Sequence, residues 1–223
     1  MKKMIKLEDA VSNTIRLLLI FAAIYSLITK NYINTFTSVL TLFLTFLPFI
    51  IARKEHIKLP PSFQIVILLF IFAAQYLGEM NDYYLRFWWW DIMLHTFSGI
   101  ILGFIGYLLV YTLNKEEKVD VYLSPFFMVL FAFTFAVALG ALWEIFEYTM
   151  DCTIGTNMQK SGLIDTMWDL IVDSIGALFT AFCGWMYETR KAEGWFKRAF
   201  NLFMKSNKKL FSNKNHKDSN IKA

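Results

Sequence analysis

Long apolar runs alternate with short polar segments along most of this chain. The hydrocarbon core of a bilayer requires about 20 residues of helix, and six of the runs reach that length. The pattern therefore predicts an all-α integral membrane protein with six transmembrane helices. With ends uncertain by about 2 to 4 residues, the predicted helices cover residues 12–29, 33–52, 61–79, 90–113, 121–149 and 164–187.

The first apolar run has one feature of a signal peptide, because Lys2, Lys3 and Lys6 precede it. No small-x-small cleavage site follows the run, so we interpret it as a retained first helix. Two prolines refine the other boundaries. Pro125 suits the first turns of the fifth helix, where a missing amide donor costs little, whereas Pro48 predicts a kink late in the second.

Composition agrees with the membrane assignment. Hydrophobic residues make up 57% of the chain and charged residues only 18%, which departs from the balance of a soluble domain. The net charge of +4 does not indicate nucleic-acid binding, because many basic residues lie in the C-terminal segment. Cys152 falls in a predicted outer loop and Cys183 near the inner end of the last helix, so we expect no disulfide between them.

The distribution of basic residues predicts the orientation. Lys and Arg gather before the first helix, in alternate connections and after the last helix. By the positive-inside rule both termini are cytoplasmic, in a multi-pass protein of the bacterial plasma (inner) membrane. The outward connections carry one basic residue each: Lys30, Arg86 and Lys160.

The chain divides into a six-helix membrane domain, residues 1–187, and a basic cytoplasmic tail, residues 188–223. The tail mixes basic and aromatic residues, which indicates an interfacial segment on an anionic leaflet followed by a disordered end. A solvated tail that only determines topology is the alternative. The aromatic run at 83–90 favours an interfacial belt or short helix over an aromatic box for a quaternary ammonium group.

Acidic residues form a stripe on the last predicted helix. Asp165, Asp169 and Asp173 are spaced at i, i+4 and i+8, and Gly176 and Thr180 continue the same face. Ionisable groups inside a membrane are energetically expensive and usually mark a function. A structural hydrogen bond to a neighbouring helix is the simpler interpretation for any single one of them.

Two other helices bring similar groups to the same outer end. The fourth helix begins with Asp91 and His95, and the fifth ends near Glu144 and Glu147. The cytoplasmic halves of the helices have nothing comparable. The candidate metal ligands are therefore Asp91, His95, Glu144, Glu147, Asp165, Asp169 and Asp173, with His95 and Asp173 as candidate catalytic residues.

Adjacent carboxylates require compensation for their charge. Arg86 is the nearby basic residue expected to help, so the remaining options are a divalent cation, shared protons or a water-filled pocket. Carboxylates with one imidazole suit Mg²⁺, Mn²⁺, Fe²⁺ or Zn²⁺.

Two other chemistries fit the sequence less well. Ser98 and His95 share one helix, unlike the nucleophile and base of an intramembrane serine protease. The remaining histidines lie outside the predicted helices, which excludes bis-histidine haem.

The polar motifs also carry a family resemblance. The runs WWDIMLHTFSG, LWEIFEY and DTMWDLIVDSIGA resemble the YjdF-like family of bacterial inner-membrane proteins, whose pattern is similar to D-x-x-x-H, E-x-x-E and D-T-x-x-D. VanZ-like proteins, named for a teicoplanin-resistance phenotype, are more distantly similar, but Asp173 and Glu147 stand where they usually have Asn and Gln. The resemblance covers about residues 60–187. It implies an all-helical membrane fold and supplies no reaction.

Three functional hypotheses follow. The first is a metal-assisted enzyme that acts on a lipid-linked or envelope phosphate substrate, with His95 as base or ligand. The second is a proton- or cation-coupled transporter in which Glu144, Asp169 and Asp173 exchange protons. The third is a structural or partner-binding membrane protein. Clustering at one end of the helices favours the enzyme, because transport sites normally lie near the midplane. We find no nucleic-acid-binding motif, and the sequence leaves the oligomeric state undefined.

Overall fold

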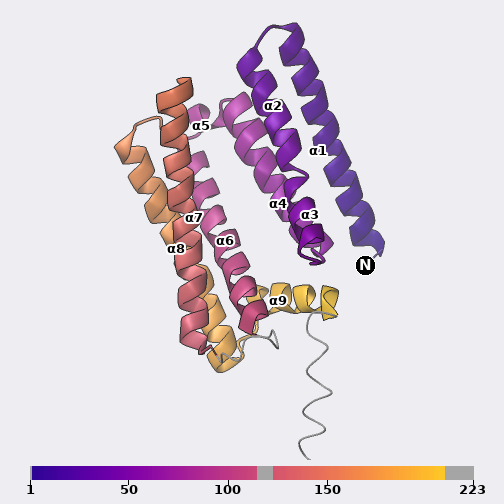
Figure 1. Cartoon of the computed structure of the whole chain (residues 1–223), viewed down its shortest axis with the longest axis vertical. Helices are drawn as coiled ribbons and strands as arrows, with labels where there is room; N and C mark the ends of the chain where they lie inside the picture. Colours follow the sequence, from indigo (N-terminus) through magenta and orange to yellow (C-terminus); the bar gives the residue numbers. More distant parts are fainter. Residues whose placement is uncertain (1, 115–122, 209–223) are drawn as a thin grey trace, which may run out of the picture. The chain divides into compact units, whose positions relative to one another are not determined.

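The computed structural model describes residues 2–114 and 123–208, and every regular element in these ranges is helical (Figure 1). Six helical segments of the described chain are long and apolar enough to cross a membrane. The predicted all-α fold with six membrane-spanning helices is therefore confirmed, while the cytoplasmic placement of both termini stays a prediction. The elements are α1 (Lys2–Ile28), α2 (Tyr32–Leu44), α3 (Leu47–Lys54), α4 (Pro61–Ile71), the π-helix η1 (Phe72–Met80), α5 (Tyr83–Arg86), α6 (Trp90–Asn114), α7 (Pro125–Ile154), α8 (Leu163–Arg190) and α9 (Trp195–Ser206).

Two boundaries differ from those expected. Helix α1 begins at Lys2 rather than at residue 12, because its polar first turns continue the helix although they lack the apolar character used to locate a span. Helix α7 extends to Ile154 and ends at Gly155, whose φ of 77° favours glycine. Pro125 is the first residue of α7, behind the Ser124 cap, while the predicted start at 121 lies outside the described residues.

The second predicted span is broken beside Pro48, as expected from that residue. Helix α2 ends at Leu44 and α3 begins at Leu47. Pro48 has no amide hydrogen to donate to the carbonyl of Leu44, so the regular helical bonding stops there. The Arg16 guanidinium of α1 donates to the carbonyl oxygen and the hydroxyl of Thr45 at 3.4 Å each, and thereby satisfies part of the interrupted backbone.

The described helices form two compact units. One contains residues 2–90 and 202–208. In its core, Ile15 and Leu19 of α1 pack with Leu68 of α4. The predicted aromatic segment in this unit does contain a short helix, α5, and Trp88 beside it is 82% exposed. Its location at the membrane interface stays a prediction.

The other unit contains residues 91–201, in which α6, α7 and α8 lie side by side (Figure 1). Helices α6 and α8 approach each other through glycines. A Cβ atom on Gly99 would overlap the carbonyl oxygen of Asp173, and one on Gly176 would overlap that of Thr96. Small residues at such an interface allow two backbones to touch, which brings the polar side chains of both helices together.

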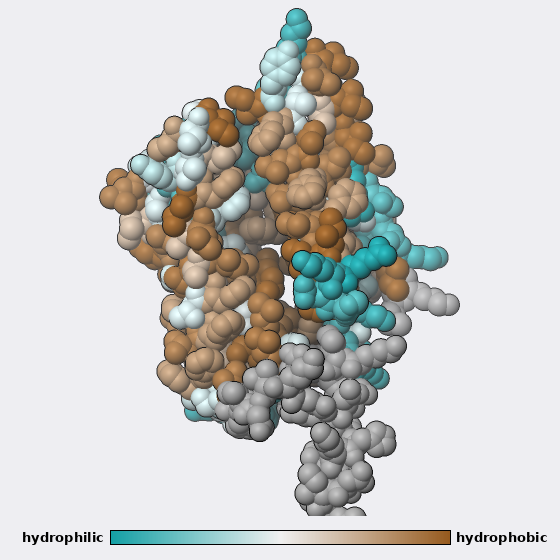
Figure 2. All heavy atoms as spheres, in the orientation of Figure 1, coloured by the Kyte–Doolittle hydropathy of each residue, from teal (hydrophilic) through white to brown (hydrophobic). Residues whose placement is uncertain are grey.

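Large apolar side chains cover the outside of the helices. Leu142 and Ile145 of α7 and Leu178 and Phe182 of α8 are all exposed. Figure 2 shows apolar residues over broad areas of the visible face. Contiguous apolar exposure of this extent is typical of surfaces that face lipid.

Part of the predicted tail is ordered. Helix α9 buries Phe196 and Phe200, whose rings contact Tyr107 of α6 with centroids 4.9 and 5.9 Å apart. The interfacial character proposed for the tail stays a prediction. Its expected disordered end lies outside the described residues.

Candidate functional site

The centre of the candidate site is an imidazole held between two helices. His95 lies one turn after the start of α6, and its Nδ1 atom is 3.1 Å from Oδ2 of Asp173 in α8. The Ser98 hydroxyl, also from α6, donates to the other oxygen of Asp173. If the imidazole is neutral and donates from Nδ1 to Asp173, Nε2 has a free lone pair.

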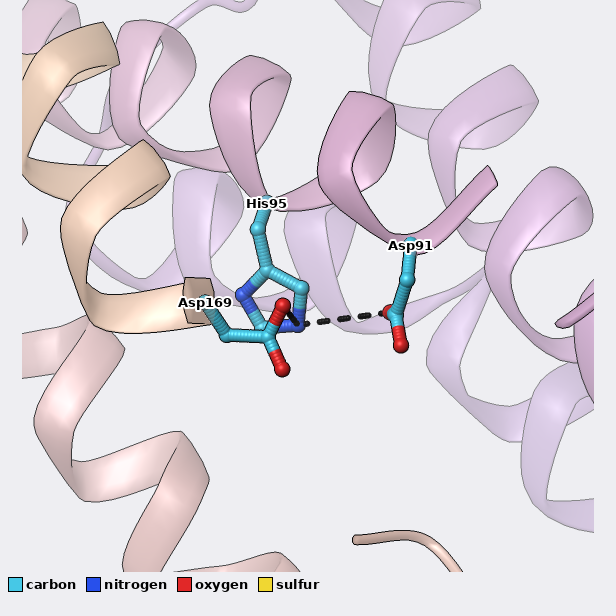
Figure 3. Close-up of side chains that lie close together, drawn as sticks. All are labelled: Asp91, His95 and Asp169. Carbon is cyan, nitrogen blue, oxygen red and sulfur yellow. Dashed lines mark ion pairs between the residues drawn. The ribbon is translucent and has the colours of Figure 1, made fainter. Parts of the chain in front are cut away.

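The Nε2 atom faces three further carboxylates. It lies 3.6 Å from Oδ1 of Asp91, 3.9 Å from Oε1 of Glu144 and 3.9 Å from Oδ1 of Asp169. These groups come from α6, α7 and α8 respectively. Figure 3 shows the Asp91 and Asp169 carboxylates directed toward the same side of the His95 ring. We call His95 and its four carboxylate neighbours, Asp91, Glu144, Asp169 and Asp173, the His95 cluster.

Glu144 is the least satisfied member of the cluster. Its side chain is 4% exposed, and neither of its oxygens forms a hydrogen bond within the described part of the chain. The Thr166 hydroxyl interacts with it electrostatically without meeting hydrogen-bond geometry. A buried carboxylate without a hydrogen-bond partner is costly, so this position favours a cation, a proton or water.

Within the described residues of this unit, a lysine contacts the cluster. Lys160, in the connection between α7 and α8, places its ammonium 2.7 Å from Oδ2 of Asp91. The expectation that Arg86 compensates the carboxylates stays a prediction; within its own unit its guanidinium pairs with Asp82 at 3.9 Å, and both side chains are more than half exposed. Sequence reasoning used Lys160 only for topology. The one sequence feature that could have pointed to Lys160 is that residues 155–162, which connect α7 and α8, contain no other basic residue.

Two candidate residues lie beside the cluster without contacting His95. Glu147 is buried but accepts a hydrogen bond of 2.9 Å from the Trp143 indole. Asp165 is partly buried and interacts with the backbone amide of Lys160. Neither carboxylate is within ion-pair distance of His95 in the described structure, so the imidazole and its four carboxylate neighbours comprise five of the seven predicted candidates.

Gly140 is a positioning residue that sequence reasoning did not assign to the site. A Cβ atom there would lie 2.7 Å from Oδ2 of Asp173. The missing side chain on α7 thus provides the space into which the Asp173 carboxylate projects toward His95.

The donor set is chemically suited to a divalent cation. Asp91, His95 and Asp169 each offer one ligand atom, and these atoms lie within 4.8 Å of one another. A mixture of one imidazole with carboxylates is compatible with Zn²⁺, Fe²⁺ or Mn²⁺. The contact between Asp173 and Nδ1 matches the usual arrangement in which a carboxylate orients a ligating histidine.

The fold and the cluster define a class: multi-pass helical membrane proteins with a buried acidic and histidine group at one end of three helices. The chain belongs to the DUF2238 family of predicted membrane proteins, whose model matches residues 11–190. The family description does not use the YjdF-like name, which stays a resemblance. An uncharacterised protein of Thermotoga maritima is 25% identical over 169 residues, or 76% of this chain and 85% of the relative. No solved structure matches the chain.

Proposed function

We propose that the His95 cluster binds a divalent cation. We further propose that the protein is a metal-assisted enzyme that hydrolyses a lipid-linked or envelope phosphate substrate at the extracytoplasmic face of the bacterial plasma membrane. Such hydrolysis adds water across a P–O bond and releases phosphate and an alcohol, so it needs no oxidant or reductant. His95 would be a ligand through Nε2, Asp173 would hold its Nδ1 proton, and Glu144 would be available to accept a proton from water.

The observation that carries this proposal is the arrangement around Nε2. Three carboxylate oxygens from three helices surround it at 3.6 to 3.9 Å. Ligand atoms about 2.1 Å from a tetrahedral ion are separated from each other by about 3.4 Å. The ligand atoms of Asp91, His95 and Asp169 lie within 4.8 Å of one another, so shifts on the order of 1 Å would bring these three residues around one ion.

Charge balance supports the same proposal. Within the described residues of this unit, four carboxylates, Asp91, Glu144, Asp169 and Asp173, pair with two basic groups, His95 and Lys160. Even a protonated imidazole would leave two negative charges uncompensated in a largely buried place, since four minus two is two. With a neutral, ligating imidazole, Lys160 and a divalent cation supply three positive charges against the four carboxylates, which reduces the excess to one negative charge.

The alternative is a network of shared protons, as in the transporter hypothesis. It is favoured by the hydrogen bond between Ser98 and Asp173, because a serine hydroxyl could exchange protons with that carboxyl. A proton network predicts no stoichiometric metal. Metal binding therefore separates the two functions.

The test is metal analysis of the purified protein. The protein in lipid nanodiscs would be titrated calorimetrically with Mg²⁺, Mn²⁺, Fe²⁺ and Zn²⁺, and its metal content measured by mass spectrometry. We expect one tightly bound ion per chain in the wild type and in His56→Ala, a control in a residue outside the cluster. His95→Ala should lose at least about tenfold in affinity. Folded wild-type protein that binds none of the four ions would contradict the metal proposal.

A further inference from the structure

Lys160 extends the cluster by one cationic group. Its ammonium bonds to Oδ2 of Asp91, while Oδ1 of the same carboxylate faces Nε2 of His95. One carboxylate thus bridges the imidazole and the ammonium. A cation bound at Oδ1 could coexist with Lys160 at Oδ2, so the ammonium would remain directly beside the metal.

The connection that carries Lys160 is held in place by side chains of both flanking helices. Asp151, near the end of α7, accepts the backbone amides of Met158 and Gln159 at 2.8 and 2.9 Å. The Gln159 side chain in turn donates to the Thr166 hydroxyl of α8 at 2.6 Å. These bonds fix the backbone on the N-terminal side of Lys160, as expected for a residue whose position matters.

Exposure shows from which side the cluster can be reached. The side chains of Lys160 and Asp91 are 21% and 19% exposed, whereas those of Glu144, Asp169 and Asp173 are 4% or less. A molecule that approaches the buried carboxylates from solvent therefore meets Lys160 and Asp91 first.

The first turn of α8, which begins three residues beyond Lys160, is apolar and exposed at Leu163 and Ile164. Helix α8 begins with Leu163 and Ile164, 76% and 66% exposed, and Trp168 follows one turn later at 57%. A hydrocarbon chain could lie along this face while its polar head reaches Lys160. Inorganic phosphate, which has no hydrocarbon chain, would bind without contacting this face.

We propose that Lys160 recognises a phosphate group of the substrate beside the metal centre, an inference that rests on the proposed metal-dependent function. An anion approaching a cluster of carboxylates is repelled, and a lysine at the point of entry offsets that repulsion. A lysine ammonium is a compact point charge that binds phosphate oxygens well. The phosphate would bind with one oxygen toward the metal and another toward Lys160, while the apolar face of α8 would hold the lipid portion.

The test uses the full chain, loaded with the metal it binds, in nanodiscs of zwitterionic lipid. The probes are inorganic phosphate and dihexanoyl phosphatidic acid, measured by calorimetry against wild type, Lys160→Met and Lys160→Arg. The matched control is Lys191→Met, because Lys191 pairs with Glu188 at the other end of α8, 3.7 Å away. Metal affinity is measured for every variant.

We expect Lys160→Met to weaken phosphate binding by at least about tenfold, the range of one charge-assisted hydrogen bond. Lys160→Arg should retain most of the affinity, and both variants should keep the metal. Binding of phosphatidic acid together with or instead of inorganic phosphate would support the inference and identify a lipid headgroup as the source. Binding of inorganic phosphate alone would support a free phosphate.

Three results would overturn the inference. The metal-loaded wild type could bind neither probe, Lys160→Met could bind both as well as wild type, or both Lys160 variants could lose the metal, which would make the residue structural. Absence of metal from the wild type is a separate result, because it contradicts the proposed metal function before Lys160 is tested. If Lys160→Met does not fold, the comparison of Lys160→Arg with Lys191→Met decides the matter, since loss of phosphate binding in the arginine variant would contradict recognition by charge.

Discussion

Asp173 of α8 holds the Nδ1 atom of His95 of α6 at 3.1 Å, and this contact directs Nε2 toward the remaining carboxylates. The two residues lie on different helices whose backbones touch at Gly99, so helix packing determines the orientation of the imidazole. The chemistry proposed for the site depends on this relationship, because the ring could otherwise turn either nitrogen toward Asp91 and Asp169.

Asp173→Asn tests whether the carboxylate orients the histidine. The substitution preserves shape but removes the charge that selects the Nδ1 tautomer. We expect metal affinity to fall by about 10- to 100-fold, as for other residues that orient a metal ligand. Ser98→Ala, which removes only a donor to Asp173, should have a smaller effect in the same titration. Equal metal affinity in Asp173→Asn and wild type would show that the contact is structural.

Glu144→Gln tests the unpaired carboxylate. Without metal, removing a buried charge that has no hydrogen-bond partner should stabilise the fold by about 1 to 3 kcal/mol, or raise Tm by several degrees. With metal, the variant should gain less stabilisation from the ion than wild type, because one negative charge facing the ion is removed. Glu147→Gln is the matched control, because Glu147 is bonded to Trp143 and does not face His95. Thermal unfolding with and without metal gives both values, and identical behaviour of the two variants would argue against a special role for Glu144.

Gly140→Ala tests the space reserved for Asp173. The added Cβ would lie 2.7 Å from Oδ2 of Asp173, so the carboxylate must move away from His95. Alanine also favours the helix by about 1 kcal/mol, so Tm should change little while metal affinity falls. Gly194→Ala, where nothing lies within 4 Å of the new atom, should leave affinity unchanged. Undiminished metal binding in Gly140→Ala would contradict the assigned position of Asp173.

The predicted topology can be tested by cysteine labelling. In a background without Cys152 and Cys183, a cysteine in place of Asn157 should react with an impermeant maleimide in intact cells. A cysteine in place of Lys54 should react only after permeabilisation, because the positive-inside rule places it in the cytoplasm. The reverse pattern would put the cluster at the cytoplasmic face and remove envelope substrates from consideration.

Much of the fold could be predicted because a membrane imposes length and hydrophobicity on each helix. The spans were recognisable from apolar runs alone, and the break beside Pro48 followed from its missing amide. The extent of α1 was not, because its first turns are polar and only backbone bonding shows that they continue the helix.

The candidate site was partly predictable for a similar reason. Helical spacing placed Asp169 and Asp173 on one face, and orientation brought them to the same end as His95. Spacing could not separate Glu144 from Glu147, which lie on one side of α7, because the difference depends on the Trp143 indole. Lys160 was missed because it lies in a connection, where no periodicity relates a side chain to a neighbouring helix.

The most direct measurement is X-ray absorption spectroscopy of the metal-loaded protein, which reports the atoms bound to the ion. We predict one imidazole nitrogen at about 2.0 to 2.1 Å with oxygen ligands for Zn²⁺, and loss of the imidazole signal in His95→Ala but not in His56→Ala. An oxygen-only shell in the wild type, or an imidazole signal that persists in His95→Ala, would contradict a metal centre built on His95.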